Sequence, residues 1–445
     1  MGYRFPKKCF ENDKISPVLS FEVIFLCFLG VKNGQSSLLQ PFSVCFPENY
    51  AFNEANKQKM TKQTMHISSE GIGEGHPDKV ADYISDSILD ACLAQDPQAH
   101  VACETLVKSN HVVVAGEITT SAVFDANAVI RQAIREIGYT YPEMLFNADT
   151  VFITNLLTKQ SGEINGAVVK EKEEAAEVGA GDQGLFFGYA CNETDQLMPA
   201  SYLLAQKIAQ KLATERKEGN VDWLRPDSKM LVTMRYEGLE PIEIENIVIA
   251  TQHAESVSQK EIETFCRERV IPSVIPAKWL TANTKYFINS SGQFTYGGPE
   301  ADTGLTGRKI IADTYGGWAH HGGGAFSGKD PSKVDRSGAY FCRWVAKNIV
   351  AAQLADRVEV RLAYTIGGTH PIHYDLTTYG TEHCDLDRLN KVVTEVFDGR
   401  VAAIIEQMDL RRPIYRQSTQ FGHFTKPNLP WEQTNRVEEL KKRCG

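Results

Sequence analysis

Apolar and polar positions recur with a helical period in the segment Asp78–Gln95. The apolar residues that fall on one face of this helical pattern are Val80, Ala81, Ile84, Ile88, Leu89 and Cys92. Pro77 suits a first helical turn, and the carboxylate of Asp78 suits the positive N-terminal end of a helix. The pattern therefore predicts a helix over residues 78–95.

The order helix, strand, strand, helix occurs three times along the chain. The first copy comprises residues 78–95, 100–106, 111–118 and 126–137, the second 197–216, 229–236, 242–251 and 258–270, and the third 334–354, 358–366, 372–378 and 386–397. Residue identities do not repeat between the copies, so the repeat rests on the pattern alone. We expect an α+β fold built from three related units.

Two long connectors, near residues 158–196 and 285–333, carry no clear helix or strand period. Long loops in compact proteins are usually functional or disordered. The charged and glycine-rich motifs of this chain lie in these connectors, which favours a functional role for them.

The first 64 residues differ from the rest of the chain. Residues 21–31 form a mostly apolar run, which is too short to span a bilayer. Several lysines precede this run, so a signal peptide is the alternative interpretation, although Glu22 interrupts the run. We expect residues 1–64 to be a poorly ordered appendage.

The composition is that of a globular protein with more than one domain. The chain has 445 residues, of which 42% are hydrophobic and 23% are charged, and its net charge is −9. The negative charge argues against general nucleic-acid binding, so an anionic ligand needs local basic residues. None of the ten cysteines forms a C-x-x-C pair, which argues for reduced thiols in the cytoplasm and against a disulfide framework or a zinc site.

Residues 322–330 combine four glycines with a lysine and an aspartate. Glycine lets backbone N–H groups approach a compact anion because no Cβ blocks the approach. Lys329 adds a cation, and Asp330 and Asp335 are hard oxygen ligands of the kind that Mg²⁺ takes. The combination suggests a site for a magnesium-bound polyphosphate, and the alternative is a flexible glycine-rich surface loop.

This stretch is not an ordinary P-loop. Gly323, Gly328 and Lys329 fit the spacing, but Asp330 stands where Ser or Thr would hold the metal. The preceding run, residues 318–321, is also a poor buried strand.

Three motifs occur in order along the chain, and they are Glu74–Lys79 (EGHPDK), Gly179–Gly184 (GAGDQG) and Gly322–Asp330 (GGGAFSGKD). Supporting runs lie at residues 223–227, 304–309 and 313–317. Together they resemble the S-adenosylmethionine synthetase (methionine adenosyltransferase) family of the bacterial and eukaryotic type, over about residues 66–435.

The resemblance implies a reaction and an architecture. ATP and L-methionine give S-adenosylmethionine, and the triphosphate leaves C5′ and is hydrolysed to phosphate and pyrophosphate. The cofactors are Mg²⁺, with two ions per active site, and K⁺. The fold has three pseudo-symmetric α+β domains, for which we expect bounds of 65–165, 176–297 and 298–437 after the appendage. Active sites lie between two subunits of a cytoplasmic homodimer, often a dimer of dimers, with no nucleic-acid or membrane partner.

This chemistry needs cations more than it needs a base. The nucleophile is a neutral thioether sulfur, so no proton has to be removed from it. The leaving triphosphate gains negative charge as the C–O bond breaks, so positioned positive groups should supply the catalysis.

The resemblance assigns roles to individual residues. The expected catalytic residues are His76, Lys229, Arg308 and Lys329. The expected ATP-binding residues are His76, Asp227, Lys229, Phe294, Asp302, Arg308, Lys309, Ala325 and Lys329. The expected methionine-binding residues are Glu117, Gln160, Asp182, Asp302 and Lys333. The expected metal ligands are Asp78 and Asp335 for Mg²⁺ and Glu104 for K⁺.

Several of these residues also have an ordinary structural interpretation. His76 could be a turn residue before the helix, Phe294 a core aromatic, and Asp78 or Asp335 a simple helix N-terminal charge. Lone lysines are usually solvated surface charges. Glu104 lies in a strand pattern, where a buried charge is costly unless it is paired or bound to a metal.

The chain departs from the family pattern at a few positions. Residues 160–170 resemble a mobile gate over the active site, with an ordinary surface loop as the alternative. Within this gate, Gly162 and Glu163 replace the usual Pro and Asp. Gln293 stands where a basic residue is usual, and Thr303 replaces a common Cys.

Two other functions remain open from the sequence. A kinase-like phosphotransferase built on the glycine-rich loop would leave ADP. A non-catalytic regulatory relative should have lost the charged residues, yet this chain retains all of them, namely His76, Asp78, Lys229, Arg308, Lys329 and Asp335.

Overall fold

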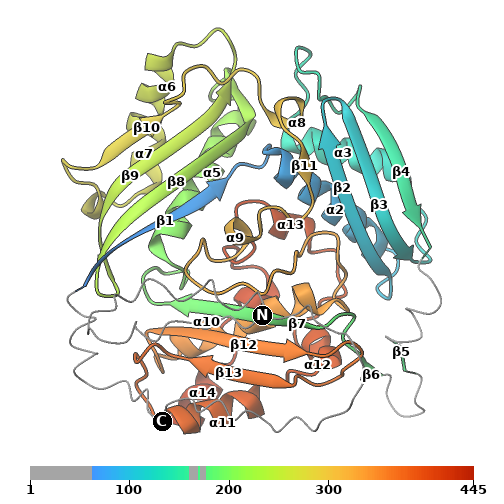
Figure 1. Ribbon diagram of the computed structural model, residues 1–445, viewed down its shortest axis with the longest axis vertical. Coiled ribbons are helices and arrows are strands. Elements are labelled where there is room, and N and C mark those ends of the chain that lie inside the picture. Colours follow the sequence, from blue (N-terminus) through green and yellow to red (C-terminus); the bar gives the residue numbers. More distant parts are fainter. Residues whose placement is uncertain (1–62, 160–168, 171–176) are drawn as a thin grey trace, which may run out of the picture. The chain divides into compact units, whose positions relative to one another are not determined.

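The computed structural model describes residues 63–159, 169–170 and 177–445. In these residues, three larger sheets with helices packed on them form an α+β fold (Figure 1). A two-stranded sheet of β5 (Val169–Lys170) and β6 (Glu177–Val178) completes the described strands. The expected appendage lies almost wholly outside the described residues, and its last residue, Thr64, begins strand β1.

The first sheet has the strand order β11-β2-β3-β4. Its strands are β2 (His100–Lys108), β3 (His111–Thr119), β4 (Phe152–Thr158) and β11 (Gly304–Leu305). Helix α2 (Pro77–Leu93) packs against β2 and against α3 (Ala126–Ile137). The two helices and two strands expected before residue 140 are confirmed, and their ends differ by at most two residues. Strand β4 was not expected.

The second sheet has the order β1-β8-β9-β10. Its strands are β1 (Thr64–Ile72), β8 (Leu224–Glu237), β9 (Glu240–His253) and β10 (Lys285–Ile288). Helix α5 (Ala200–Lys217) packs against β1 and β8. The helix expected over 258–270 extends to Val274 and is irregular. It consists of α6 (Gln259–Phe265), a π-helical turn (Cys266–Val270) and α7 (Ile271–Val274).

The third sheet has the order β13-β12-β7. Its strands are β7 (Gly184–Cys191), β12 (Arg357–Tyr364) and β13 (His373–Thr377). Helix α10 (Val334–Ala351) packs on β7 and β12. The remaining short elements are η2 (Ala277–Trp279), α8 (Gly298–Ala301), α9 (Ile310–Asp313), α11 (Leu386–Val396), α12 (Val401–Gln407), α13 (Arg416–Thr419), η3 (Pro430–Glu432) and α14 (Val437–Cys444).

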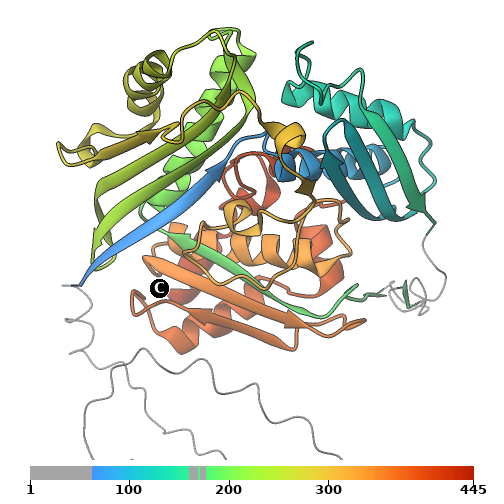
Figure 2. The same cartoon turned by 45° about the horizontal axis from the view of Figure 1, so that its top comes forward.

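Each sheet contains a strand from a distant part of the chain. β1 lies antiparallel to β8, as Figure 2 also shows, β7 pairs with β12, and β11 pairs with β2. Residues 158–196 and 285–333, which show no clear helix or strand period in the sequence, therefore do contain strands, among them β7, β10 and β11. β7 is largely buried along its second half, so it lacks the alternation that marks a half-buried strand.

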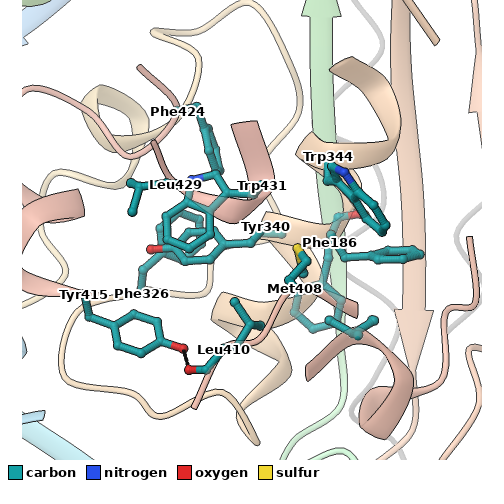
Figure 3. Close-up of a cluster of buried hydrophobic side chains, with 14 of the residues drawn as sticks. Phe186, Phe326, Tyr340, Trp344, Met408, Leu410, Tyr415, Phe424, Leu429 and Trp431 are labelled. Carbon is teal, nitrogen blue, oxygen red and sulfur yellow. Dashed lines mark hydrogen bonds between the residues drawn. The ribbon is translucent and has the colours of Figure 1, made fainter. Parts of the chain in front are cut away.

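An aromatic cluster joins the glycine-rich loop to helix α10 and to the C-terminal segment (Figure 3). The rings of Tyr340 and Trp431 stack with centroids 3.8 Å apart. Phe326, in the loop itself, lies 5.4 Å from Tyr340 and 6.1 Å from Phe424 between ring centroids. Burying these large rings contributes much of the local packing energy, so the loop is anchored at Phe326.

Of the helices in the described ranges, none has the length and apolarity that a bilayer-spanning helix needs.

Candidate functional site

His76 precedes helix α2 and caps its N-terminus. Its Nδ1 accepts a hydrogen bond from the backbone N–H of Asp78 at 3.2 Å, so the proton of the neutral ring lies on Nε2. Burial, and then the positive charge of Lys309, lower the pKa of His76 to about 4. At neutral pH this side chain is therefore an uncharged hydrogen-bond donor through Nε2–H.

The Asp78 carboxylate forms ion pairs with two cationic side chains of a loop that is more than 200 residues away in the sequence. Arg308 Nε donates to Oδ1 at 2.8 Å, and Lys309 Nζ donates to Oδ2 at 2.5 Å. The N–H of Leu305 also donates to Oδ1, at 3.0 Å. Burial acts to raise the pKa of Asp78, but these bonds outweigh it and hold the pKa below its ordinary value.

Residues 304–309 lie close against helix α2 because their glycines lack side chains. A Cβ on Gly304 would lie 2.1 Å from the carbonyl oxygen of Pro77, so a larger residue would displace the loop. Gly307 has φ of +81° and donates its N–H to Asp82 at 2.8 Å. The two cations are thus presented from a fixed backbone.

Asp227 is buried beside these residues, on strand β8. It accepts the N–H of Gly298 at 2.8 Å. Burial raises the pKa of Asp227 to about 7, and the neighbouring charge of Asp302 adds to this rise. Lys229, two residues further along β8, is exposed and forms an ion pair with Glu70 at 2.7 Å.

Phe294 lies near this group. A Cβ on Gly297 would lie 2.8 Å from its ring, and the Phe294 N–H donates to His253 Nε2 at 3.0 Å. Phe294 is only partly buried, which argues against its interpretation as a core aromatic. We call the whole set the α2 group, and its members are His76, Asp78, Asp227, Lys229, Phe294, Asp302, Arg308 and Lys309.

The glycine-rich loop holds a second set of charges. Lys329 forms an ion pair with Asp335, which lies in the first turn of α10. The loop passes so close to Asp335 that a Cβ on Gly324 would lie 2.4 Å from its Oδ1. Ala325 follows Gly324 and is partly buried. This close packing of backbone, cation and carboxylate leaves no room for a side chain larger than that of glycine at position 324.

Asp330 does not have the free oxygens that the sequence suggested. It is buried and accepts the N–H of Val101 at 2.7 Å, the hydroxyl of Ser332 at 2.6 Å and Nζ of Lys333 at 2.5 Å. These bonds hold the pKa of Asp330 below its ordinary value although burial acts to raise it. The expectation that Asp330 is a metal-type ligand is therefore not supported by its contacts, which are structural.

A Cβ added at Gly181 would lie 3.6 Å from the Lys333 side chain, so the adjacent Asp182 lies near Lys333. Asp182 itself is exposed. Glu117 pairs across the first sheet with Ala102, and Ala102 forms a β-bridge with Lys329. Glu117 and Lys329 are therefore neighbours of the same strand residue.

Glu104 lies two residues beyond Ala102 on β2, on the same sheet face as Glu117. It is exposed, so the argument that its burial demands a partner is wrong for the single chain. We call this second set the loop group, and its members are Glu104, Glu117, Asp182, Ala325, Lys329, Lys333 and Asp335. Gln160 and almost all of the expected gate lie outside the described residues.

The α2 group and the loop group remain separate within one chain. In residues 63–159 and 177–445, no hydrogen bond or ion pair joins a member of one group to a member of the other. The backbone segments that carry the two groups do come close to each other. A Cβ added at Gly307, which precedes Arg308, would lie 2.5 Å from Cβ of Ala325. Each group therefore presents its own cations.

Three buried charged residues under the site were given no role from the sequence. Asp82 and Asp86 follow Asp78 on α2 at intervals of four residues, so the three share one helix face. Arg336, on α10, pairs with Asp86. The available signal was the spacing of these aspartates on a helix that also carries an apolar face, since such charges have to be paired when they are buried.

The chain is similar to known proteins over most of its length. The chain matches the family models for the N-terminal domain of S-adenosylmethionine synthetase over residues 64–162, the central domain over 177–294 and the C-terminal domain over 296–433. It is 55% identical over 391 residues to an S-adenosylmethionine synthase of Akkermansia muciniphila, covering 86% of this chain and 99% of the relative. It is 50% identical over 385 residues to an S-adenosylmethionine synthase of Clostridium botulinum, covering 84% of this chain and 98% of the relative. The chain belongs to the S-adenosylmethionine synthetase family.

Proposed function

We propose that this chain is an active methionine adenosyltransferase that synthesises S-adenosyl-L-methionine from ATP and L-methionine. The observation that supports it best is the pair of cation sets, Arg308 and Lys309 on Asp78, and Lys329 on Asp335, each presented from a glycine-containing loop. A triphosphate is the substrate part that needs several cations at once.

In the reaction, the methionine sulfur uses a lone pair to form a bond with C5′ of ATP. The C5′–O bond breaks, and its electron pair leaves with the triphosphate oxygen. His76 is neutral and carries its proton on Nε2, so it can donate a hydrogen bond to that oxygen as charge develops there. The sulfur needs no base, which agrees with a site rich in cations.

Arg308 can turn from Asp78 to the phosphate oxygens, and with Lys229 and Lys329 it forms the phosphate clamp. Lys309, which also pairs with Asp78, lies beside this clamp and adds positive charge. Removing one such donor typically costs about 10²–10³ in rate. The triphosphate is then hydrolysed to phosphate and pyrophosphate before release.

The remaining residues are proposed to bind the two substrates. Asp227, Phe294 and the Ala325 backbone hold the nucleoside and phosphates, and Phe294 stacks on adenine. Glu117 receives the methionine ammonium group. The other methionine-side residues are Gln160, Asp182, Asp302 and Lys333, of which Asp302 also contacts adenosine.

The carboxylates present fit the two cations that the family generally uses. Asp78 and Asp335 each hold a cationic side chain in the described structure, and carboxylate oxygens are the ligands that Mg²⁺ prefers. The close approach of Gly324 to Asp335 keeps this carboxylate beside the loop backbone. Bound Mg²⁺, expected as two ions, would neutralise triphosphate charge. The exposed carboxylate of Glu104 is a suitable oxygen ligand for K⁺.

We infer further that the complete site lies between two copies of the chain, with the α2 group of one copy facing the loop group of the other. The separation of the two groups within one chain supports this arrangement. Apolar surface is also exposed at Phe152, Leu156 and Leu185, which a second copy could cover. A dimer, or a dimer of dimers, would bring four cations to one triphosphate.

A cytoplasmic location suits the thiols. All seven cysteines in the described ranges are free, and six of them are buried.

One assay tests the reaction. Purified protein is incubated with ATP, L-methionine, Mg²⁺ and K⁺, and the products are separated by chromatography with mass detection. We expect S-adenosylmethionine with phosphate and pyrophosphate. Formation of ADP would instead indicate a kinase-like transfer, and no methionine-dependent cleavage of ATP would contradict the proposal.

A further inference from the structure

Beneath the glycine-rich loop, Asp86 and Arg336 form a fully buried ion pair. Arg336 Nη1 donates to Asp86 Oδ1 at 2.6 Å, and Nη2 donates to Oδ2 at 2.6 Å. This two-pronged geometry is the strong form of an arginine–carboxylate pair. Asp86 lies on α2 and Arg336 in the first turn of α10, so the pair ties together two helices that are distant in the sequence.

The same two side chains also bind the backbone of the loop that carries Lys329. Asp86 Oδ1 accepts the N–H of Gly328 at 2.8 Å. Arg336 Nη1 donates to the carbonyl oxygen of Phe326 at 3.0 Å and to that of Lys329 at 3.3 Å. The pair therefore contacts the backbone immediately before and after the Lys329 side chain.

Glycine at position 328 is needed for this turn. Its φ is +79°, and a Cβ there would lie 1.9 Å from the carbonyl oxygen of Cys103 on β2. Asp86 thus accepts a hydrogen bond from a residue whose backbone is in close contact with the first sheet. The backbone of Lys329 has β2 on one side and the buried ion pair on the other.

Stability alone does not account for this arrangement. A buried ion pair is often no more stabilising than apolar residues of the same volume, because both charges have to leave water. Three of the pair's remaining bonds go to the backbone of residues 326–329, and the others go to Tyr340 on α10 and to Ser418 and Thr419 on α13. Neither side chain reaches solvent, so neither can touch a substrate, and any effect of the pair on the reaction has to be indirect.

We propose that Asp86 and Arg336 are positioning residues, which hold the backbone of residues 326–329 so that the Lys329 ammonium group meets the triphosphate. The choice of triphosphate as ligand rests on the proposed function. The positioning itself rests on the contacts described above.

A paired substitution tests this role without leaving one buried charge alone. Asp86→Asn with Arg336→Gln removes both charges and keeps a hydrogen-bonding group at each position. The matched control is Arg343→Gln with Glu432→Gln, which removes a second buried ion pair, between α10 and η3, with bonds at 2.8 and 3.0 Å. Lys347→Gln is added to this control, because Lys347 also pairs with Glu432, at 2.6 Å. Arg343 donates its other bonds to the carbonyl oxygens of Tyr189, Gln196 and Leu197, far along the chain from the loop.

The first measurement is calorimetric binding of inorganic tripolyphosphate with Mg²⁺, and the second is kcat and KM for S-adenosylmethionine formation. For the Asp86/Arg336 variant we expect tripolyphosphate binding weaker by about 10-fold and kcat lower by at least about 10-fold, because a displaced cation loses most of its effect. For the Arg343/Glu432 control we expect a similar fall in melting temperature with unchanged binding and kcat. Unchanged tripolyphosphate binding and kcat in the Asp86/Arg336 variant would overturn the proposal.

A second variant covers the case in which the paired substitution does not fold. Arg336→Lys keeps the positive charge beside Asp86 but cannot reproduce the fork that reaches the Phe326 and Lys329 carbonyls. It should weaken tripolyphosphate binding in the same direction, and wild-type binding in this variant would equally overturn the proposal. If the wild-type protein forms no S-adenosylmethionine, the proposed function fails, while tripolyphosphate binding still decides the positioning role.

Discussion

The ammonium group of Lys309 lies 2.5 Å from the carboxylate of Asp78, although 231 residues separate them in the sequence. The same ammonium group is close enough to His76 to lower its pKa, second only to burial. One lysine therefore satisfies a buried carboxylate and helps to keep a neighbouring imidazole neutral.

Removing Lys309 should raise the pKa of His76. In the wild-type protein the pKa is about 4, so the ring should not titrate above pH 5. In Lys309→Ala the pKa should rise but stay below the ordinary value near 6.5, because burial, the larger cause, remains. The measurement is an NMR titration of selectively labelled histidine, with the His76 signal assigned by His76→Gln.

The control for this titration is Lys278→Ala, which removes a lysine of the η2 turn that does not belong to the α2 group. It should leave the His76 signal unchanged. A His76 pKa that stays at about 4 in Lys309→Ala would show that burial alone sets it.

Substituting Lys329 should lower the rate strongly without unfolding the protein. Lys329→Ala removes a cation whose only ion pair in the described ranges is the partly exposed one with Asp335. We expect kcat/KM for S-adenosylmethionine formation to fall about 10²–10³-fold, as for loss of a single charge-stabilising donor. Melting temperature and circular dichroism should match those of wild type and of the surface control Lys260→Ala. Near wild-type activity would remove Lys329 from the clamp.

Asp227 should make stability depend on pH. Its pKa in the fold is about 7, because burial raises it above the unfolded value near 3.9. Between these two values the folded chain holds a proton that the unfolded chain has lost, so wild-type stability falls as pH rises from about 4 to 7.

Asp227→Asn removes this dependence, and its amide oxygen can still accept the Gly298 N–H. Relative to wild type, the variant should therefore gain stability as pH rises, by at most about 1.4 kcal/mol per pH unit, and the gain should level off above pH 8. Denaturant unfolding of the ligand-free protein at pH 5.5, 6.5 and 8 measures this, with the exposed Asp222→Asn as control. A constant difference between Asp227→Asn and wild type at all three pH values would mean that Asp227 titrates normally.

Local patterns in the sequence were enough to predict helix α2 and the position of Asp78 in its first turn, because both depend on neighbouring residues. They were not enough for β7, whose partner β12 lies more than 160 residues away and whose buried second half shows no alternation. The Asp86–Arg336 ion pair could not be predicted from the sequence for the same reason, since 250 residues separate its two members. Charges that are paired across such distances look like ordinary helix charges until the fold brings them together.

Glu104 should govern the response to potassium. Its carboxylate is exposed on β2, so Glu104→Gln should cost little stability. We expect most of the stimulation of S-adenosylmethionine formation by K⁺ to disappear, with a smaller change in the rate measured without K⁺. Titration of activity with KCl against a choline chloride control tests this, and Glu218→Gln serves as the matched variant. An unchanged potassium response would remove Glu104 as the ligand.

The placement of the active site between two copies predicts a specific pattern of complementation. Lys309→Ala removes a member of the α2 group, and Lys329→Ala removes a member of the loop group, so each variant alone should be nearly inactive. In a mixed dimer of the two variants, one site carries both substitutions and the other carries neither. Such a dimer, purified through two different tags, should recover about half of the wild-type rate because symmetry leaves one of two sites intact.

The reciprocal mixture makes the test decisive. A dimer of wild type with the Lys309→Ala/Lys329→Ala double variant has one substitution in each site if the sites lie between copies, and should be nearly inactive. If each site lay within one chain, this second dimer would keep about half of the rate and the first would have none. Because the two arrangements predict opposite results for the same pair of samples, differences in expression or stability between variants cannot imitate the outcome.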